Sequence, residues 1–339
     1  MSQFILIVVF IIMLIISLSN NKRPTPTLTL LLGLILIIVI VFRDSQMADY
    51  REYVRIFEYY PETVEIFHKT LIYNLRSLGF GYIAYFFIIA ILTVSIELYS
   101  IEKMTDRLWA ISILVWLGSS FILNDMVTIR AGLAGALMLM MIKAKADHHI
   151  KASLLFYILA ILCHMSSAIL IFIFFLSTNH SYRVFYLLCL TGGFACPLIG
   201  FSLTDFLGVV GIDLLDAKLE IYLQGDTEAN IFSLFQLLRY AIAFCLWINY
   251  NKLSSHNKYF PIALKTYTIG CIWYFLNYKI MAIGWRISCL LWTTDVIVYP
   301  LLVYLFSNKL KNYWKFVPAS IAAILFIANV TMNQYWSPK

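Results

Sequence analysis

Apolar runs long enough to form membrane helices recur along the whole chain, from Phe4 to Leu18 near its start to 316–333 near its end. In hydrocarbon, a spanning segment must satisfy its own backbone N–H and C=O groups, which favours helices. These runs are too long and too uniformly apolar for the short alternating strands of a barrel. With 62% hydrophobic and only 13% charged residues, a soluble globular class is excluded. We therefore predict an all-α, polytopic membrane helical bundle.

The apolar runs predict about twelve membrane crossings, within a range of roughly 11 to 13. We expect one integral membrane domain over residues 1–339, with two larger outer loops at about 43–79 and 204–230. Short helices lying at the membrane interface are expected in the first of these loops. The expected crossings are 4–18, 28–42, 80–98, 108–123, 128–142, 152–163, 166–177, 183–203, 231–250, 260–278, 286–306 and 316–333.

The distribution of lysines predicts how the chain is oriented in the membrane. Lysine-bearing loops are expected on the cytoplasmic side of a membrane, and the net charge of +7 agrees with such loops. Both loops flanking 153–177 are basic, so this segment must cross twice, as a tilted or re-entrant hairpin that turns at His164. One helix there would instead invert the later topology. With the hairpin, both termini lie outside. The basic residues of the loops assigned to the cytoplasm are Lys22, Arg23, Lys103, Arg107, Lys143, Lys145, Lys151, Arg183, Lys252, Lys258, Lys309, Lys311 and Lys315.

Arg130 is the first candidate site residue. It follows the polar corner Asn124-Asp125 and opens the next apolar run, so it lies in the first turn of a membrane helix, where free N–H groups favour an anion. Small residues from Ala131 to Ala136 allow neighbouring helices to approach closely. An intramembrane arginine is costly unless it meets negative charge, which suggests function. The alternative is that Arg130 only pairs with Asp125 or caps a neighbouring helix.

Arginines gather on the predicted outer side, where orientation does not require them. Arginine is suited to bidentate recognition of phosphate or carboxylate, which suggests a lipid-linked phosphate or pyrophosphate ligand. For Arg51, Arg55 and Arg76, pairing with nearby acids is the favoured interpretation. Arg286 and Arg239 resemble Arg130 in lying within or at the start of apolar runs. The full outer set is Arg43, Arg51, Arg55, Arg76, Arg130, Arg239 and Arg286.

Two further groups can carry chemistry at the same face. His164 lies at the proposed turn and can act as a general base, bind ligand or be structural. Asp49 can act as a base or bind sugar hydroxyls, and Tyr50 and Tyr53 offer stacking faces for sugars.

Several other classes of site are not expected. The six cysteines lie in apolar runs without metal-ligand spacing and are interpreted as buried hydrophobes. No Walker loop, nucleophile elbow, HExxH or dinucleotide turn occurs, nor a DxD-like motif in the outer loops. We therefore expect no cofactor, no metal, no nucleotide-sugar donor and no nucleic-acid partner.

Taken in order along the chain, these motifs resemble the EpsG/Wzy-type bacterial polysaccharide polymerases. The sequence departs from the family pattern at Met47-Ala48, where a glycine is familiar. The motifs that carry the resemblance are Arg43, Asp49-Tyr50 with Tyr53, Arg130-Ala131-Gly132-Leu133-Ala134, His164-Met165-Ser166-Ser167, Lys218 with Tyr222, and Arg286.

The resemblance implies an inverting, metal-independent, GT-C-like glycosyltransferase in the bacterial inner membrane. It would join undecaprenyl-pyrophosphate-linked repeat units into O-antigen or capsular chains at the periplasmic face, releasing undecaprenyl pyrophosphate. Arg130 and Arg286, with Arg239, would stabilise the leaving group. His164 leads as the base and Asp49 follows. A chain-length regulator is a further candidate partner, besides membrane lipid.

Two other classes of function stay open. An O-antigen ligase would use similar arginines and a histidine at the outer face. A flippase or transporter of the same lipid-linked oligosaccharide should show internal repeats and charges along a central path, and the sequence shows no convincing repeat. A membrane acyltransferase using His164 would leave the outer arginines without a role.

Overall fold

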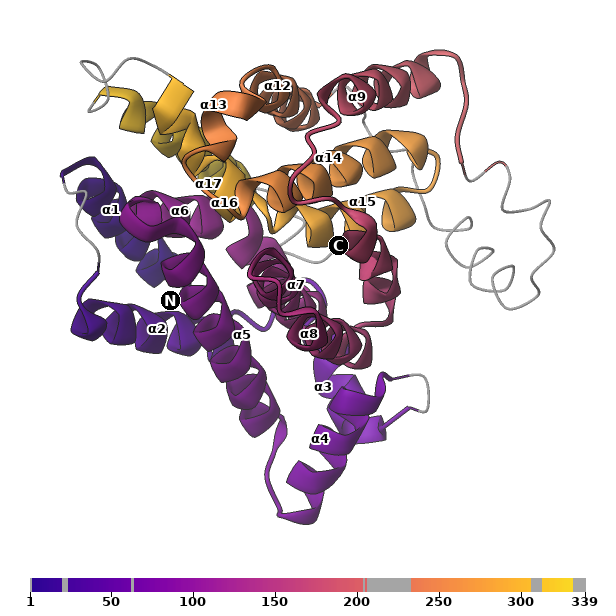
Figure 1. Cartoon of the computed structure of the whole chain (residues 1–339). Helices are drawn as coiled ribbons and strands as arrows, with labels where there is room; N and C mark the ends of the chain where they lie inside the picture. Colours follow the sequence, from indigo (N-terminus) through magenta and orange to yellow (C-terminus); the bar gives the residue numbers. More distant parts are fainter. Residues whose placement is uncertain are drawn as a thin grey trace.

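The computed structural model describes residues 2–19, 24–61, 64–203, 205, 233–305 and 313–331, and every regular element among them is helical. The helices form one bundle, with α7 near its centre and the pair α3 and α4 at one margin (Figure 1). The all-helical prediction is therefore confirmed. Lys218 and Tyr222 lie outside the described residues.

The first half of the chain supplies the margin and the centre of the bundle. Pro26 opens α2 after Thr25, whose hydroxyl accepts the N–H of Leu28 at 3.3 Å, as expected of a proline in the first helical turn. The elements are α1 (Ser2–Ser19), α2 (Pro26–Val41), α3 (Tyr50–Tyr59), α4 (Ile66–Ser77), α5 (Tyr82–Thr105), η1 (Asp106–Leu108), α6 (Trp109–Trp116), η2 (Leu117–Val127) and α7 (Ile129–Ala146).

The second half packs around α7 and against the first half. Its elements are α8 (Ile150–Cys163), η3 (Met165–Phe175), α9 (Arg183–Leu198), α12 (Leu234–Ile248), α13 (Tyr250–Ser254), α14 (Phe260–Leu276), α15 (Met281–Trp292), α16 (Asp295–Val298), η4 (Pro300–Leu305), η6 (Tyr313–Lys315) and α17 (Phe316–Thr331).

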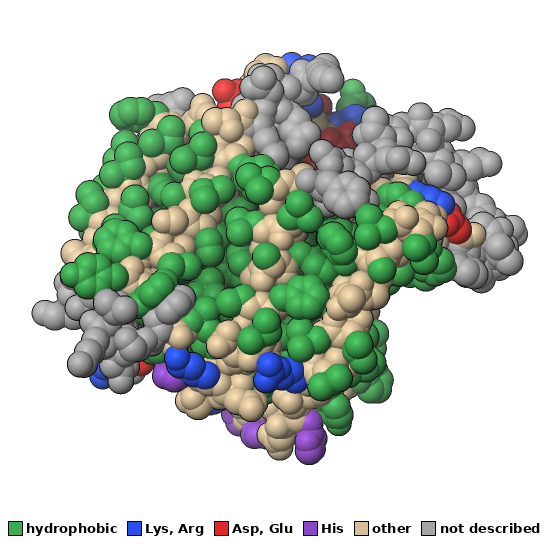
Figure 2. Space-filling view, turned by 90° about the horizontal axis from the view of Figure 1, so that it is seen from above, with side chains coloured by type: hydrophobic (Ala, Val, Ile, Leu, Met, Phe, Trp, Pro, Cys, Tyr) green, Lys and Arg blue, Asp and Glu red, His purple; other side chains and the backbone are tan. Residues whose placement is uncertain are grey.

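Three helical stretches within the described ranges are long and apolar enough to cross a membrane: Ser2–Ser19, Tyr82–Val127 and Tyr313–Thr331. Shorter apolar helices of 10–17 residues accompany them, among them α2, α8, η3, α9 and α12. Hydrophobic side chains cover much of the surface seen in Figure 2, and Lys, Arg and His side chains gather along its lower edge. These features fit a membrane protein, and the number of crossings stays a prediction.

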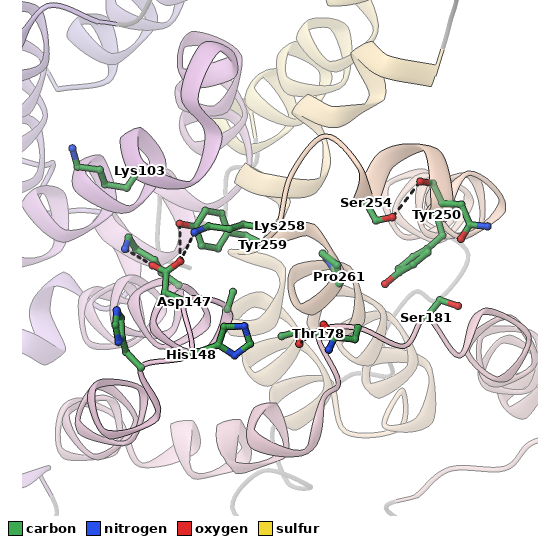
Figure 3. A pocket seen from close by; sticks show the side chains of 15 residues that line it. Lys103, Asp147, His148, Thr178, Ser181, Tyr250, Ser254, Lys258, Tyr259 and Pro261 are labelled. Atoms are coloured by element: carbon green, nitrogen blue, oxygen red, sulfur yellow. Dashed lines mark hydrogen bonds and ion pairs between the residues drawn. The ribbon is translucent and has the colours of Figure 1, made fainter.

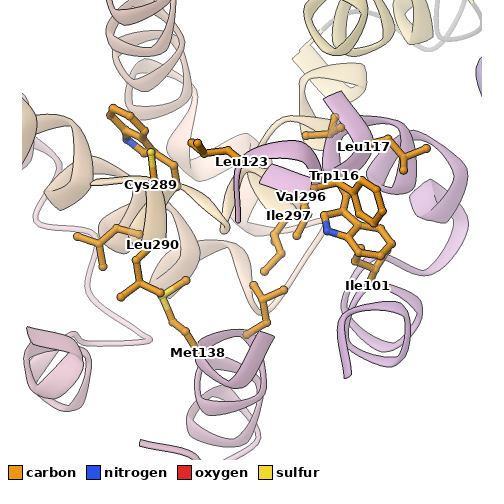
Figure 4. Packing of buried hydrophobic residues seen from close by; sticks show 14 of the residues in the cluster. Ile101, Trp116, Leu117, Leu123, Met138, Cys289, Leu290, Val296 and Ile297 are labelled. Carbon is orange, nitrogen blue, oxygen red and sulfur yellow. The ribbon is translucent and has the colours of Figure 1, made fainter. Parts of the chain in front are cut away.

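Helix α7 is buried on nearly every side, because its sequence is apolar or small all round rather than on one stripe. It packs against α8, α5, η2 and α15. Figure 4 shows Met138 of α7 facing Leu290 of α15, with Trp116 and Ile101 in the same buried cluster. The position of α7 fixes the start of this helix, and with it Arg130, inside the bundle.

Glycines allow the closest helix approaches, as the small-residue run in α7 predicted. A Cβ on Gly132 would lie 2.7 Å from the Asn124 carbonyl oxygen, and one on Gly135 would lie 2.9 Å from Thr293 Oγ1. At the crossing of η2 with α17, a Cβ on Gly118 would collide with the carbonyl oxygen of Ala322.

The segment after α7 folds as a helical hairpin. Helix α8 ends at Cys163, His164 has an extended backbone with φ −155° and ψ 113°, and η3 begins at Met165. The two arms contact each other, and the Tyr157 hydroxyl donates to the Ala168 carbonyl at 3.0 Å. The turn therefore lies at His164, where the hairpin interpretation expected it.

We predict that Gly118→Ala lowers the apparent melting temperature of the detergent-solubilised chain. The added methyl group meets backbone rather than a movable side chain, and overpacking of this kind costs about 1–3 kcal/mol. The measurement is the fraction of chain that stays monodisperse after heating. Gly192→Ala is the control, because nothing lies within 4 Å of its Cβ position in α9. Equal losses in the two variants would contradict this account of the η2–α17 crossing.

Candidate functional site

A cavity of about 260 Å³ lies where the beginnings of α3 and α7 meet α15 and the turn at His164. It collects side chains that are far apart in sequence, and most of its polar lining is charged or able to form hydrogen bonds. Its lining includes Asp49, Glu52, Tyr53, Asn124, Thr128, Arg130, His164, Trp285 and Arg286. Five of the residues proposed from the sequence (Asp49, Tyr53, Arg130, His164 and Arg286) thus share one cavity.

Glu65 links two of these residues. Its Oε2 accepts a hydrogen bond from Arg130 Nη1 at 2.5 Å, and its Oε1 lies 3.3 Å from His164 Nδ1. The Glu65 side chain is only 12% exposed, so solvent screens this contact little. Arg130 therefore pairs with Glu65 rather than with Asp125, whose Oδ2 accepts from Trp116 Nε1 at 2.9 Å.

The Glu65 carboxylate stays ionised at ordinary pH. Burial alone would raise its pKa, but the hydrogen bond with His164 and the positive charge of Arg130 outweigh burial and lower the pKa to about 2. An ionised carboxylate can only accept a hydrogen bond, so Nδ1–H of His164 donates to Glu65 Oε1. With its proton on Nδ1, the imidazole tautomer carries its lone pair on the other ring nitrogen, Nε2.

Arg130 retains capacity for a ligand. Its Nε is buried and has no hydrogen-bond partner among the described residues, and its guanidinium carbon lies 5.6 Å from the centre of the Tyr53 ring. A buried donor without a partner is uncommon in folded proteins, so an acceptor bound in the cavity would satisfy it.

Helix α4 is held in place by a buried histidine. His68 Nε2 donates to the Cys163 carbonyl at 2.9 Å, and the Tyr85 hydroxyl donates to His68 Nδ1 at 3.0 Å. The carbonyl can only accept, which sets this tautomer. This contact ties the start of α4, which follows Glu65, to the residue preceding His164.

Asp49 reaches the cavity through an unusual backbone conformation. It has φ 61° and ψ −9°, a left-handed conformation that few residues other than glycine adopt, and it immediately precedes α3. Burial raises the pKa of Asp49, and the positive charges of Arg286 and Arg130 partly oppose this rise. With Met47-Ala48 in place of the familiar glycine, Asp49 itself takes the left-handed conformation.

A second cavity of about 420 Å³ adjoins the first, and Arg286, Trp285, Thr128, Leu123 and Cys289 line both. It extends between η2, α12, α15 and α17, and its further lining is largely apolar, including Phe235, Tyr274, Leu325 and Ala328. The two cavities therefore form a polar and a more apolar chamber with a shared wall.

Arg239 lines the second cavity and is already paired. Its Nη1 donates to Asp295 Oδ2 at 3.1 Å, and its guanidinium carbon lies 4.4 Å from the centre of the Trp292 ring. Ser119 donates to the same carboxylate oxygen of Asp295 at 2.8 Å. Asp295 thus holds Arg239 in position.

Other residues proposed from the sequence lie outside both cavities. Arg43 is buried, donates to the Ile40 carbonyl at 2.9 Å and lies over the Phe86 ring, while Tyr50 packs against Tyr82 and Phe86. These two residues brace α3 against α5. Pairing with a nearby acid, favoured from the sequence for three outer arginines, is found for Arg55, which bonds to Glu52 at 3.0 Å. The other two bond to neutral groups: Arg51 donates to Gln46, and Arg76 donates to the Phe57 carbonyl.

Glu65 was missed by sequence reasoning, as were Trp285 and Asn124. Glu65 is one of several acids in a mixed-charge segment, and its position just before an amphipathic helix does not distinguish it. Across the described ranges, no cluster of three or more histidine, cysteine, aspartate or glutamate side chains is arranged to hold a metal ion.

Comparison with known families decides what kind of protein has this site. The model of the EpsG family matches residues 26–338, nearly the whole chain. The chain belongs to the EpsG family. EpsG is a family of Wzy-like polysaccharide polymerases, so membership indicates that the chain is a polysaccharide polymerase. No curated protein and no solved structure matches the chain.

The low pKa of Glu65 predicts a pH-dependent contribution to stability. The folded pKa of about 2 lies below the ordinary value of 4.5, so the contribution is complete above the ordinary value and is lost as the pH falls toward 2. The difference in apparent melting temperature between the unsubstituted chain and Glu65→Gln should be constant from about pH 8 to pH 5 and shrink below about pH 4.5.

Glu102→Gln is the control, because Glu102 is half-exposed and pairs with the adjacent Lys103 at 3.3 Å. It should change the melting temperature little at every pH. A Glu65→Gln difference that persisted undiminished at about pH 3 would argue against an ionised Glu65 between Arg130 and His164.

Proposed function

We propose that this EpsG-family protein polymerises undecaprenyl-pyrophosphate-linked oligosaccharide repeat units by inverting glycosyl transfer. The supporting observation is the single cavity that holds Arg130, Arg286, Asp49 and His164, with Glu65 bridging Arg130 and His164. Such a reaction needs fixed positive charge for a leaving pyrophosphate and a base for a hydroxyl, and the cavity offers both kinds of group.

Arg130 and Arg286 are assigned to the leaving group. In the transfer step, the acceptor hydroxyl oxygen bonds to the anomeric carbon while the bond from that carbon to the pyrophosphate oxygen breaks. Negative charge then develops on the pyrophosphate, and prearranged cations in a site with little water stabilise it strongly. The partnerless Nε of Arg130 is a donor available for this contact.

His164 is assigned as the general base. With Glu65 accepting from Nδ1, the lone pair on Nε2 takes the proton of the attacking hydroxyl, and Glu65 stabilises the resulting imidazolium. Glu65 is thus a positioning residue. Asp49 is far from His164 in sequence but lines the same cavity. It is assigned to binding sugar hydroxyls and is the second candidate for the base.

The adjoining apolar cavity is assigned to the first isoprene units of the lipid. It shares Arg286 with the polar cavity, so a pyrophosphate at the shared wall would place its sugar on one side and its lipid on the other. On the orientation predicted from the lysines, this site faces the outer side of the bacterial inner membrane.

We expect Arg130→Ala to abolish long polymer in cells that lack the native gene and are complemented with the variant. Loss of one cation at the developing charge typically costs about 10²–10³ in rate. The readout is a gel profile of glycan length at matched protein level. Arg55→Ala, which removes an exposed arginine paired only with Glu52, is the control and should restore the full ladder.

The same assay separates the roles of His164 and Glu65. His164→Ala should lower the rate about 10²–10⁴-fold if His164 is the base, and Glu65→Gln should lower it less because the imidazole remains.

Full-length polymer from Arg130→Ala would contradict the proposal. If polymer accumulates on the lipid carrier in the strain that lacks the native gene, a ligase is favoured. If the glycan-length profile of that strain is unchanged, a transporter is favoured.

A further inference from the structure

A second polar hollow lies at the other end of α7, remote from the cavity around Arg130. Arg130 is in the first turn of α7 and Asp147 caps its last turn, so about 25 Å of helix separate them at 1.5 Å per residue. The hollow has a volume of about 960 Å³ and opens between α5, α7, α13, α14 and the segment that follows η3. Figure 3 shows Lys258 and Tyr259 pointing toward Asp147 from one side, with His148 nearby.

One acid holds two lysines at this hollow. Asp147 pairs with Lys143 Nζ at 2.7 Å and with Lys258 Nζ at 2.6 Å, and the Tyr259 hydroxyl donates to the same carboxylate at 3.2 Å. Lys103, His148 and His149 add to the lining. Two ammonium groups sharing one carboxylate leave an excess of positive charge at the wall of the hollow.

Further uncompensated charge lies behind the wall. Lys265 is fully buried and donates to the carbonyls of Ser177 and His180 at 2.6 and 2.5 Å, and Lys145 donates to the Phe174 carbonyl at 2.5 Å. Neither lysine has a carboxylate partner in the described part of the chain. These bonds anchor the segment that carries Thr178 and Ser181 into the lining.

Membrane orientation explains lysines at this end of the bundle but does not explain this arrangement. Orientation requires only that basic residues flank the membrane segments, and exposed, solvated lysines meet that requirement. The fully buried Lys265 and the partly buried Lys145, bonded to neutral carbonyls behind the wall, instead add positive potential to that of the lysines that line the hollow. Basic pockets between membrane helices of this kind favour phosphate groups.

We propose that this hollow is a binding site for a phosphate-bearing anion, contacted by Lys143 and Lys258. The phosphate group would share these two ammonium groups with Asp147, and the hydroxyls of Thr178 and Ser181 would donate to its remaining oxygens. Both the head group of an anionic lipid and a soluble organophosphate carry this chemistry. The site is separate from the transfer chemistry proposed above and does not depend on it.

The test uses the full chain in nanodiscs, with two probes. ATP is titrated by calorimetry into nanodiscs of phosphatidylcholine, and retained phosphatidylglycerol is counted by native mass spectrometry. With at least one of the two probes, we expect saturable binding of one molecule of probe per protein chain. The double variant Lys143→Gln/Lys258→Gln should weaken that binding by at least about tenfold, the effect of losing charge-assisted contacts.

Two matched variants make the result specific. Lys151→Gln removes an exposed charge near the same end of the bundle but outside the hollow, and Arg130→Ala removes the cation of the other cavity. Lys151→Gln should bind as the unsubstituted chain does, and Arg130→Ala should leave binding at the hollow intact, so that a loss caused by Arg130→Ala alone reports an anion held in the other cavity. Binding in the ATP arm alone identifies a soluble organophosphate, and binding in the lipid arm alone identifies a head group. No saturable binding in either arm, or equal weakening by Lys151→Gln, would overturn the proposal.

Discussion

The carboxylate of Glu65 is the contact on which the candidate site depends. It joins Arg130 at the start of α7 to His164 at the turn between α8 and η3, across sequence separations of 65 and 99 residues. Without this negative charge, a guanidinium inside the bundle would lack its partner and the imidazole would lack an orienting group. One acid thus pairs with the buried cation and, in the proposed mechanism, orients His164 for proton transfer.

The two ends of α7 carry different cations for different physical reasons. At its start, arginine presents a planar set of donors in a cavity of limited volume, which suits a pyrophosphate bound in one orientation. At its end, lysines surround a wider and more open hollow, which suits a single phosphate group without strict geometry. The apolar, small-residue body of α7 holds these two regions apart.

Sequence alone was sufficient for the helical class and for several residues of the cavity, because apolar runs and intramembrane cations are local signals. Arg130, His164 and Arg286 stand out at the ends of apolar runs. Glu65 does not, because its significance comes only from the packing of α4 against the hairpin turn. The left-handed backbone of Asp49 and the pairing of Arg239 with Asp295 likewise arise from tertiary contacts.

The most direct test of the account is reconstitution of the purified chain in liposomes. The substrate is the lipid-linked repeat unit extracted from cells that lack this protein. The account predicts products that lengthen by whole repeat units, with release of one lipid pyrophosphate for each bond formed. It also predicts that Arg130→Ala, folded and inserted equally well, yields neither. A lipid-linked repeat unit that the unsubstituted chain leaves unchanged, or equal polymer from Arg130→Ala, would contradict it.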